Sequence, residues 1–151
     1  MKRLLAPFFL LLILIGGYAC SKKDPLVGTW TSNSEVLGIP GTSEATFHSD
    51  GRYSSITTME GQTGKGLRVT DLGTWKLSED GKLTIQLSDI QWETIGASMG
   101  TSTRVQNRLQ SGKEALIDEV NRMGAVEVKW DGDDQFSLTF AGKAQTYRRK
   151  S

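Results

Sequence analysis

Five residues near the middle of the chain match the spacing of a hydrolase nucleophile. Gly96-Ala97-Ser98-Met99-Gly100 has the Gly-x-Ser-x-Gly pattern, which holds a serine on a strained turn between a strand and a helix. The histidine base of such an enzyme follows the serine in the chain, but the single histidine here, His48, precedes Ser98. A lone histidine also lacks the partner ligands of a transition-metal site. We therefore expect no catalytic residue, no metal and no cofactor, and we predict that the protein is not an enzyme.

The single cysteine, Cys20, lies at a position where covalent modification is expected. Met1-Lys2-Arg3 supplies a positive start, residues 4–15 are almost wholly apolar, and mostly small residues lead to Cys20, which is the layout of an export signal. The alternative is a membrane anchor, but the apolar run is shorter than the roughly 20 residues that cross a bilayer. Ala19-Cys20 resembles the lipobox of bacterial lipoproteins. That resemblance implies cleavage before Cys20 and attachment of a lipid to it.

The expected organisation is a signal peptide over 1–19, a short tether over 20–25 and one barrel domain over 26–151. The resemblance to lipoproteins, with Ser21 after the cysteine, implies the outer membrane. Because Ser21-Lys22-Lys23-Asp24 is basic rather than acidic, we expect the side facing the periplasm. The predicted location is thus the cell envelope, with a lipid anchor in the membrane. A single cysteine also excludes an intramolecular disulfide and a four-cysteine zinc site.

The charge balance predicts no nucleic-acid partner. The chain has 18 basic and 17 acidic residues, and removal of Lys2 and Arg3 with the signal leaves 16 basic residues against 17 acidic ones. A formal charge near −1 lacks the basic footprint of a nucleic-acid-binding surface.

Three Asp-Gly pairs, at 50–51, 80–81 and 131–132, separate segments in which apolar residues alternate with polar ones. Asp-Gly between alternating segments is a strong hairpin signal, because both residues tolerate a positive φ. Alternation with one apolar face is typical of half-buried antiparallel strands. The sequence therefore predicts a mainly β fold with about eight or nine strands, near 26–35, 44–49, 52–59, 66–77, 82–88, 90–95, 125–131, 135–140 and 143–149.

One segment, near 112–123, favours a helix instead. Ser111 and Glu114 have the spacing of a capping box, and Leu116, Val120 and Met123 follow at helical intervals. Gly124 can end the helix in a left-handed conformation. Val105 and Leu109 mark a second, weaker helical segment before it. We expect this helix to form a lid or a plug at the mouth of the barrel.

The tetrapeptide Val27-Gly28-Thr29-Trp30 recurs with one change as Leu72-Gly73-Thr74-Trp75. Gly28-x-Trp30 on a first strand, followed by antiparallel strands, resembles the lipocalin and wider calycin barrels, and in particular the small bacterial lipocalin-like lipoproteins. The resemblance implies that Trp30 closes one end of a single antiparallel barrel and that a basic residue near the end of the last strand packs across it. Arg148 and Arg149 are the candidates. Arg149 is preferred because alternation puts it on the same face as Tyr147.

A barrel of about eight strands is either filled by side chains or holds one small ligand. Eight aromatic residues are expected to point inward, and three of them, Tyr53, Trp75 and Trp92, are the candidate ligand-binding residues, because strands in the middle of the barrel are the ones that face a lumen. The leading hypothesis is a membrane-tethered binding protein for a small hydrophobic or amphipathic ligand. The alternative is a filled barrel that acts as an inhibitor or an envelope-complex subunit through a protein partner. The full set of expected inward aromatics is Trp30, Phe47, Tyr53, Trp75, Trp92, Trp130, Phe136 and Phe140.

Overall fold

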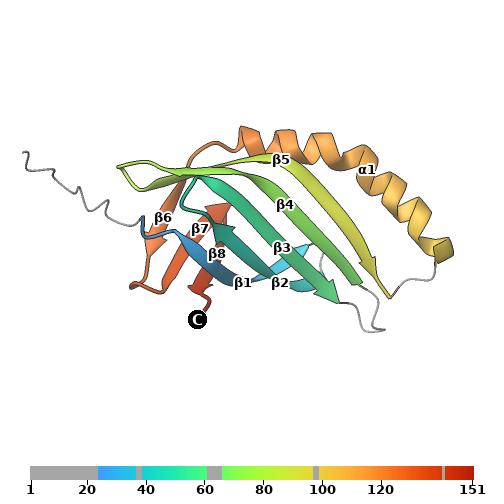
Figure 1. Ribbon diagram of the computed structural model, residues 1–151, viewed down its shortest axis with the longest axis horizontal. Coiled ribbons are helices and arrows are strands. Elements are labelled where there is room, and N and C mark those ends of the chain that lie inside the picture. The colour runs from blue at the N-terminus through green and yellow to red at the C-terminus, as the bar shows by residue number, and fades with distance from the viewer. Residues whose placement is uncertain (1–23, 37–38, 61–65, 97–98, 141) are drawn as a thin grey trace, which may run out of the picture.

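The computed structural model of the protein describes residues 24–36, 39–60, 66–96, 99–140 and 142–151 (Figure 1). Each strand pairs antiparallel with the next, and β1 also pairs with β8, so that the strands form a closed barrel. The mainly β fold with one inserted helix is thus confirmed. Residues 1–19, Cys20 and Ser98 lie outside the described residues. The elements are β1 Gly28–Val36, β2 Ile39–Phe47, β3 Arg52–Glu60, β4 Gly66–Leu77, β5 Lys82–Ile95, α1 Met99–Arg122, β6 Val126–Trp130, β7 Gln135–Phe140 and β8 Lys143–Arg149.

All three predicted Asp-Gly turns connect neighbouring strands. Their glycines have φ values of +85° at Gly51, +78° at Gly81 and +84° at Gly132. This left-handed conformation is open to glycine at no steric cost, so these three sites fix where the hairpins turn.

The predicted break between strands 82–88 and 90–95 is wrong, because both belong to β5. The register between β4 and β5 shifts at this place: Leu72 pairs with Asp89, whereas Gly73 pairs with Leu87, so that Ser88 is an extra residue. A β-bulge of this kind adds one residue to the strand, so that odd-numbered residues face inward before it and even-numbered residues face inward after it. The sequence pattern therefore changes phase inside one continuous strand.

Two other strand boundaries differ from the prediction. β2 begins at Ile39 rather than near 44, and Pro40-Gly41 at its start lacks the residue types that favour strands. β1 begins at Gly28, because residues 24–27 form a turn in which the backbone N–H of Val27 donates to the carbonyl of Asp24.

The helix is much longer than predicted, and its start was misplaced. α1 begins at Met99, so Ser111 and Glu114 lie within the helix and do not cap it. The weaker helical segment at Val105 and Leu109 is part of the same helix. The predicted end is confirmed, because α1 stops at Arg122 and Gly124 has a φ of +71°.

α1 lies along the edge of β5 that faces away from β4, over the part of β5 that does not pair with β6 (Figure 1). β6 pairs with β5 only at Lys82 and Leu83. Farther along, the side-chain amide of Asn121 forms the two hydrogen bonds that a neighbouring strand would form with Leu87. Its Oδ1 accepts from the Leu87 N–H at 2.7 Å, and its Nδ2 donates to the Leu87 carbonyl at 3.0 Å. An ion pair between Lys113 and Asp89 adds a second attachment.

Within the described part of the chain, the helix is not long and apolar enough to cross a membrane.

Candidate functional site

One end of the barrel is filled by aromatic side chains. Trp30 and Phe136 are fully buried, and their ring centroids lie 4.7 Å apart in an edge-to-face arrangement. Phe47 contacts Phe136, and Trp75 packs edge-on against Phe47 at 5.4 Å. Leu26, from the turn before β1, is also fully buried, and its carbonyl accepts a hydrogen bond of 2.8 Å from the indole N–H of Trp30. We call this region the closed end.

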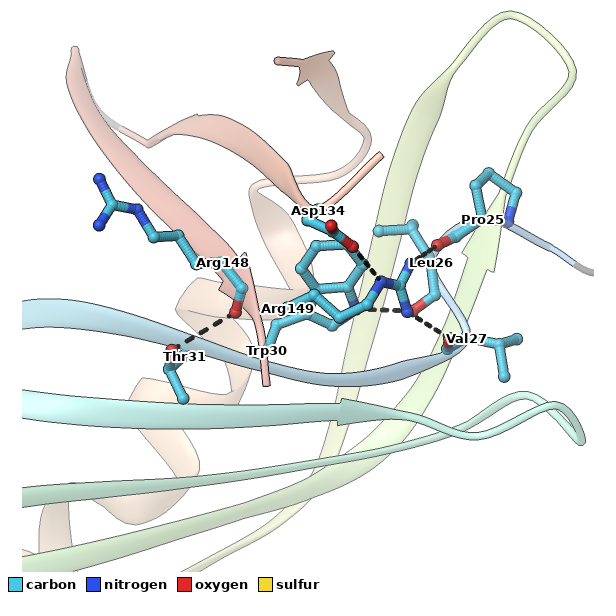
Figure 2. A network of polar contacts seen from close by, with 8 residues as sticks. All are labelled: Pro25, Leu26, Val27, Trp30, Thr31, Asp134, Arg148 and Arg149. Atoms are coloured by element: carbon cyan, nitrogen blue, oxygen red, sulfur yellow. Dashed lines mark hydrogen bonds and ion pairs between the residues drawn. The ribbon is translucent and has the colours of Figure 1, made fainter. Parts of the chain in front are cut away.

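Arg149 covers the outside of the closed end (Figure 2). Its guanidinium carbon lies 4.1 Å from the centre of the Trp30 ring, which is cation–π geometry. The same guanidinium donates to the carbonyls of Val27 at 3.1 Å and Pro25 at 2.8 Å and pairs with Asp134 at 3.3 Å. The expected packing of Arg149 across Trp30 is therefore present, and the arginine ties β8 to the chain before β1.

Both glycines of the repeated Gly-Thr-Trp permit a close approach. Gly28 has a φ of +137°, and a Cβ there would lie 2.8 Å from an Nη atom of Arg149. At Gly73, beside the bulge, a Cβ would lie 2.1 Å from the backbone carbonyl oxygen of Gln86. At Gly73 only glycine fits against the backbone of the neighbouring strand, and at Gly28 the positive φ would strain any other residue.

The other end of the barrel encloses a cavity of about 670 Å³. This volume lies within the range of about 300–1,000 Å³ that is usual for ligand pockets. Every strand and the last turn of α1 contribute to the wall. The lining residues are Asn33, Ser34, Pro40, Ser43, Ala45, Tyr53, Ser55, Thr57, Asp71, Leu83, Ile85, Leu87, Val120, Met123, Gly124, Val126, Phe140, Lys143, Ala144, Gln145 and Tyr147.

One wall of the cavity is polar. The Ser43 hydroxyl forms hydrogen bonds with Thr57 at 2.7 Å and Ser34 at 3.1 Å, across β1, β2 and β3. On β3 and β4, the hydroxyl of Ser55 donates to Oδ2 of Asp71 at 2.7 Å. Burial raises the pKa of the Asp71 carboxyl above its ordinary value, and the hydrogen bond from Ser55 opposes this shift.

Two tyrosines stand where the polar wall meets the closed end. Tyr147 stacks on Phe136, with the ring centroids 4.9 Å apart and the planes 9° apart. Burial raises the pKa of Tyr147 to about 12, with a smaller contribution from the charge of Asp71. Burial also raises the pKa of Tyr53 well above its ordinary value, and the nearby Tyr147 and Asp71 add to this shift. Both phenols are therefore neutral donors at neutral pH.

The remaining wall is apolar and includes the helix. β5 contributes Leu83, Ile85 and Leu87, the last turn of α1 contributes Val120, and Met123 follows directly after the helix. Met123 is 46% exposed although it lines the cavity, so the helix end borders both the lumen and solvent. Only this end of α1 borders the cavity, whereas most of the helix lies along β5, and a role as lid or plug stays a prediction.

A second hollow of about 350 Å³ lies where β1 and β8 separate. These strands pair only at Trp30 with Arg149 and at Thr31 with Arg148. Beyond that point a hydrogen bond of 2.9 Å from Gln145 to Ser32 connects them. Because Asn33, Ala144 and Gln145 line both hollows, the second one adjoins the cavity along this seam. Its lining residues are Thr31, Ser32, Asn33, Thr42, Ala144, Gln145, Thr146 and Arg148.

Of the three candidate ligand-binding residues, only Tyr53 lines the cavity. Trp75 belongs to the closed end, where its indole N–H donates to the carbonyl of His48 at 2.9 Å. Trp92 lies on β5 beyond the bulge, and its indole nitrogen is buried without a partner among the described residues. Four of the expected inward aromatics do fill the closed end, but Trp130, at its edge, is 38% exposed.

Sequence reasoning missed the polar wall, and Asp71 above all. A signal was present, because inward positions along a strand recur every second residue. Counting back from Trp75 in steps of two leads through Gly73 to Asp71. The same count from Trp30 leads to Ser32 and Ser34, which predicts small inward side chains and hence space.

A comparison of the chain with protein-family models and with curated protein sequences finds no match. Among the described residues, no group of three or more His, Cys, Asp or Glu side chains is placed to hold a metal ion.

Proposed function

We propose that this protein is a non-enzymatic, lipocalin-like binding protein that carries a small amphipathic ligand in its barrel. The observation that supports this most directly is the cavity of about 670 Å³ behind a tightly packed closed end. A barrel filled from end to end would instead favour the alternative, a module that acts only through a protein partner. The contact between Arg149 and Trp30, together with the strand order, supports the lipocalin-like part of the proposal.

The proposal includes a location in the cell envelope, with Cys20 carrying a lipid. Only five residues, Ser21 to Pro25, separate Cys20 from Leu26, and an extended chain covers at most about 3.3–3.6 Å per residue. The Pro25 carbonyl is held by Arg149 at the closed end. The chain at Pro25 therefore lies at the closed end, opposite the cavity, so a lipid on Cys20 would hold this end near the membrane and leave the mouth accessible.

Native mass spectrometry of the full-length protein, purified from its own cell envelope, tests this function. The proposal predicts one small molecule released per protein. Stoichiometric co-purification of another protein, with no small molecule, would favour the interaction module. The mass of the intact protein in the same experiment reports whether Cys20 is the first residue and is lipidated.

A further inference from the structure

The cavity wall contains a carboxylate that no described basic group neutralises. Asp71 lies on the inward row of β4, between Ser55 on β3 and Ile90 on β5. Its one hydrogen bond among the described residues comes from Ser55. None of the ion pairs in the described part of the chain includes Asp71. Lys143, the one basic residue that lines the cavity, is exposed at the start of β8.

A half-buried carboxylate with a single donor has unused capacity for a ligand. An ionised carboxylate can accept about four hydrogen bonds, and one hydroxyl supplies only one of them. Removing such a charge from water is costly unless an opposite charge or several donors replace the water. The titratable neighbours on the wall, Tyr53 and Tyr147, are neutral and cannot balance the charge.

The wall beside this carboxylate is suited to hydrocarbon. β5, the strand next to β4, contributes three aliphatic side chains, and Val120 of α1 and Met123, directly after the helix, add two more at the rim. Phe140 and Val126 complete the apolar part. A ligand that satisfies both surfaces has one positive, hydrogen-bond-donating group and an apolar body.

We propose that the cavity takes a small organic amine, with the protonated nitrogen at the Asp71 carboxylate and the hydrocarbon part along β5 and the end of α1. This inference rests on the proposed function, because it requires an occupied lumen. It excludes a fatty-acid-like ligand, whose carboxylate would face Asp71 with the same charge. A neutral alcohol would keep the apolar contacts and lose the ionic contribution.

Calorimetric titration of the full-length protein with octylamine, 1-octanol and octanoate compares three head groups on the same hydrocarbon chain. A hydrogen bond between charged partners predicts that octylamine binds about tenfold more tightly than 1-octanol. Octanoate should bind most weakly. Titrations into buffer without protein provide the blank, and the head-group comparison on the unmodified protein needs no variant.

The variant Asp71→Asn should reduce the affinity for octylamine to that for 1-octanol and leave 1-octanol binding unchanged. Asp133→Asn, in the exposed turn between β6 and β7, removes the same charge and should change neither. Octanoate binding best, or an amine preference that survives in Asp71→Asn, overturns the amine assignment while leaving the proposed function in place. Failure of all three ligands to bind contradicts the proposed function as well.

Discussion

The two ends of the barrel are built from the same strands but from side chains of different size. At the closed end, β1, β2 and β4 direct Trp30, Phe47 and Trp75 inward, and these rings pack against one another. Farther along the same strands, the inward positions carry small or short polar side chains, and a cavity of about 670 Å³ remains. The polar ones are Ser32, Ser34, Ser43 and Asp71.

The difference shows how one sheet can combine stability with an open site. Each aromatic ring buries about 150–250 Å², so the packed rings give the closed end the largest share of hydrophobic stabilisation. The open end makes a smaller contribution of this kind, because its inward side chains are small and bury less apolar surface. Arg149 reinforces the closed end with bonds to the chain before β1, while Asn121 and Lys113 attach the helix near the open end.

The largest effect is expected from truncating the centre of the closed end. Trp30→Ala should lower the free energy of unfolding by about 3–5 kcal/mol, because a fully buried ring is replaced by a void. Phe140, on the cavity wall, is half-buried, and Phe140→Ala should lower the free energy of unfolding by less than half as much. Urea denaturation followed by circular dichroism measures both values. Equal losses would contradict the conclusion that the closed end is the more tightly packed one.

Removing the positive charge over Trp30 should have the next largest effect. Arg149→Met keeps a long side chain but leaves the carbonyls of Pro25 and Val27 without their donor, and we expect a loss of about 2 kcal/mol. Arg148→Met, one residue earlier and exposed, is the matched control and should change stability by less than about 0.5 kcal/mol. A loss in Arg148→Met as large as in Arg149→Met would argue against the role of the Trp30 contact.

The two hydrogen bonds between Asn121 and Leu87 should contribute to stability at the open end. Asn121→Ala should destabilise the protein by about 1–2 kcal/mol, because it leaves the N–H and carbonyl of Leu87 without partners at the strand edge. Asp118→Ala, exposed on the same helix, serves as the control. Hydrogen exchange should show faster exchange of the Leu87 amide in Asn121→Ala. An unchanged exchange rate would indicate that the hydrogen bonds from Asn121 contribute little to stability.

The smallest effect is the pH dependence caused by Asp71. Because its folded-state pKa is raised above the ordinary 3.8, the protonated carboxyl stabilises the fold at lower pH, and this contribution is lost as pH rises through the raised pKa. The midpoint of thermal unfolding of Asp71→Asn, relative to the unmodified protein, should therefore rise between about pH 3 and pH 7. A relative midpoint that falls over this range would mean that the folded-state pKa of Asp71 is lowered rather than raised.

The turns and most strands could be predicted because each depends on local chemistry, whereas the packing of Arg149 across Trp30 was implied by the resemblance to lipocalins. Asp-Gly fixes hairpins through backbone conformation, and strict alternation identifies a half-buried strand. The long β5 and the start of α1 could not be predicted in this way. The bulge at Ser88 shifts the alternation within one strand, and the capping-box pattern at Ser111 occurs inside a helix whose extent depends on docking to β5.

The candidate site was predicted less well than the fold, for a physical reason. The sequence-based prediction uses aromatic residues as markers of the lumen, yet large rings such as Trp75 fill space and so mark where the lumen is absent. The cavity lies where inward residues are small, and its half-buried carboxylate, Asp71, is found by counting back along the strand from Trp75 rather than by searching for aromatic residues. Of the three candidates, Tyr53 alone lines the cavity, at the boundary between the two ends.

The most direct test of a hollow, ligand-binding open end is calorimetric titration with 1-octanol, a neutral probe, on a pair of matched variants. Thr57 points into the cavity and Thr58, the next residue on β3, does not line it. The account predicts saturable binding of one 1-octanol molecule to the unmodified protein and to Thr58→Trp, and loss of binding in Thr57→Trp, where the new ring occupies the lumen. Equal binding by both tryptophan variants, or no binding to the unmodified protein, would contradict it.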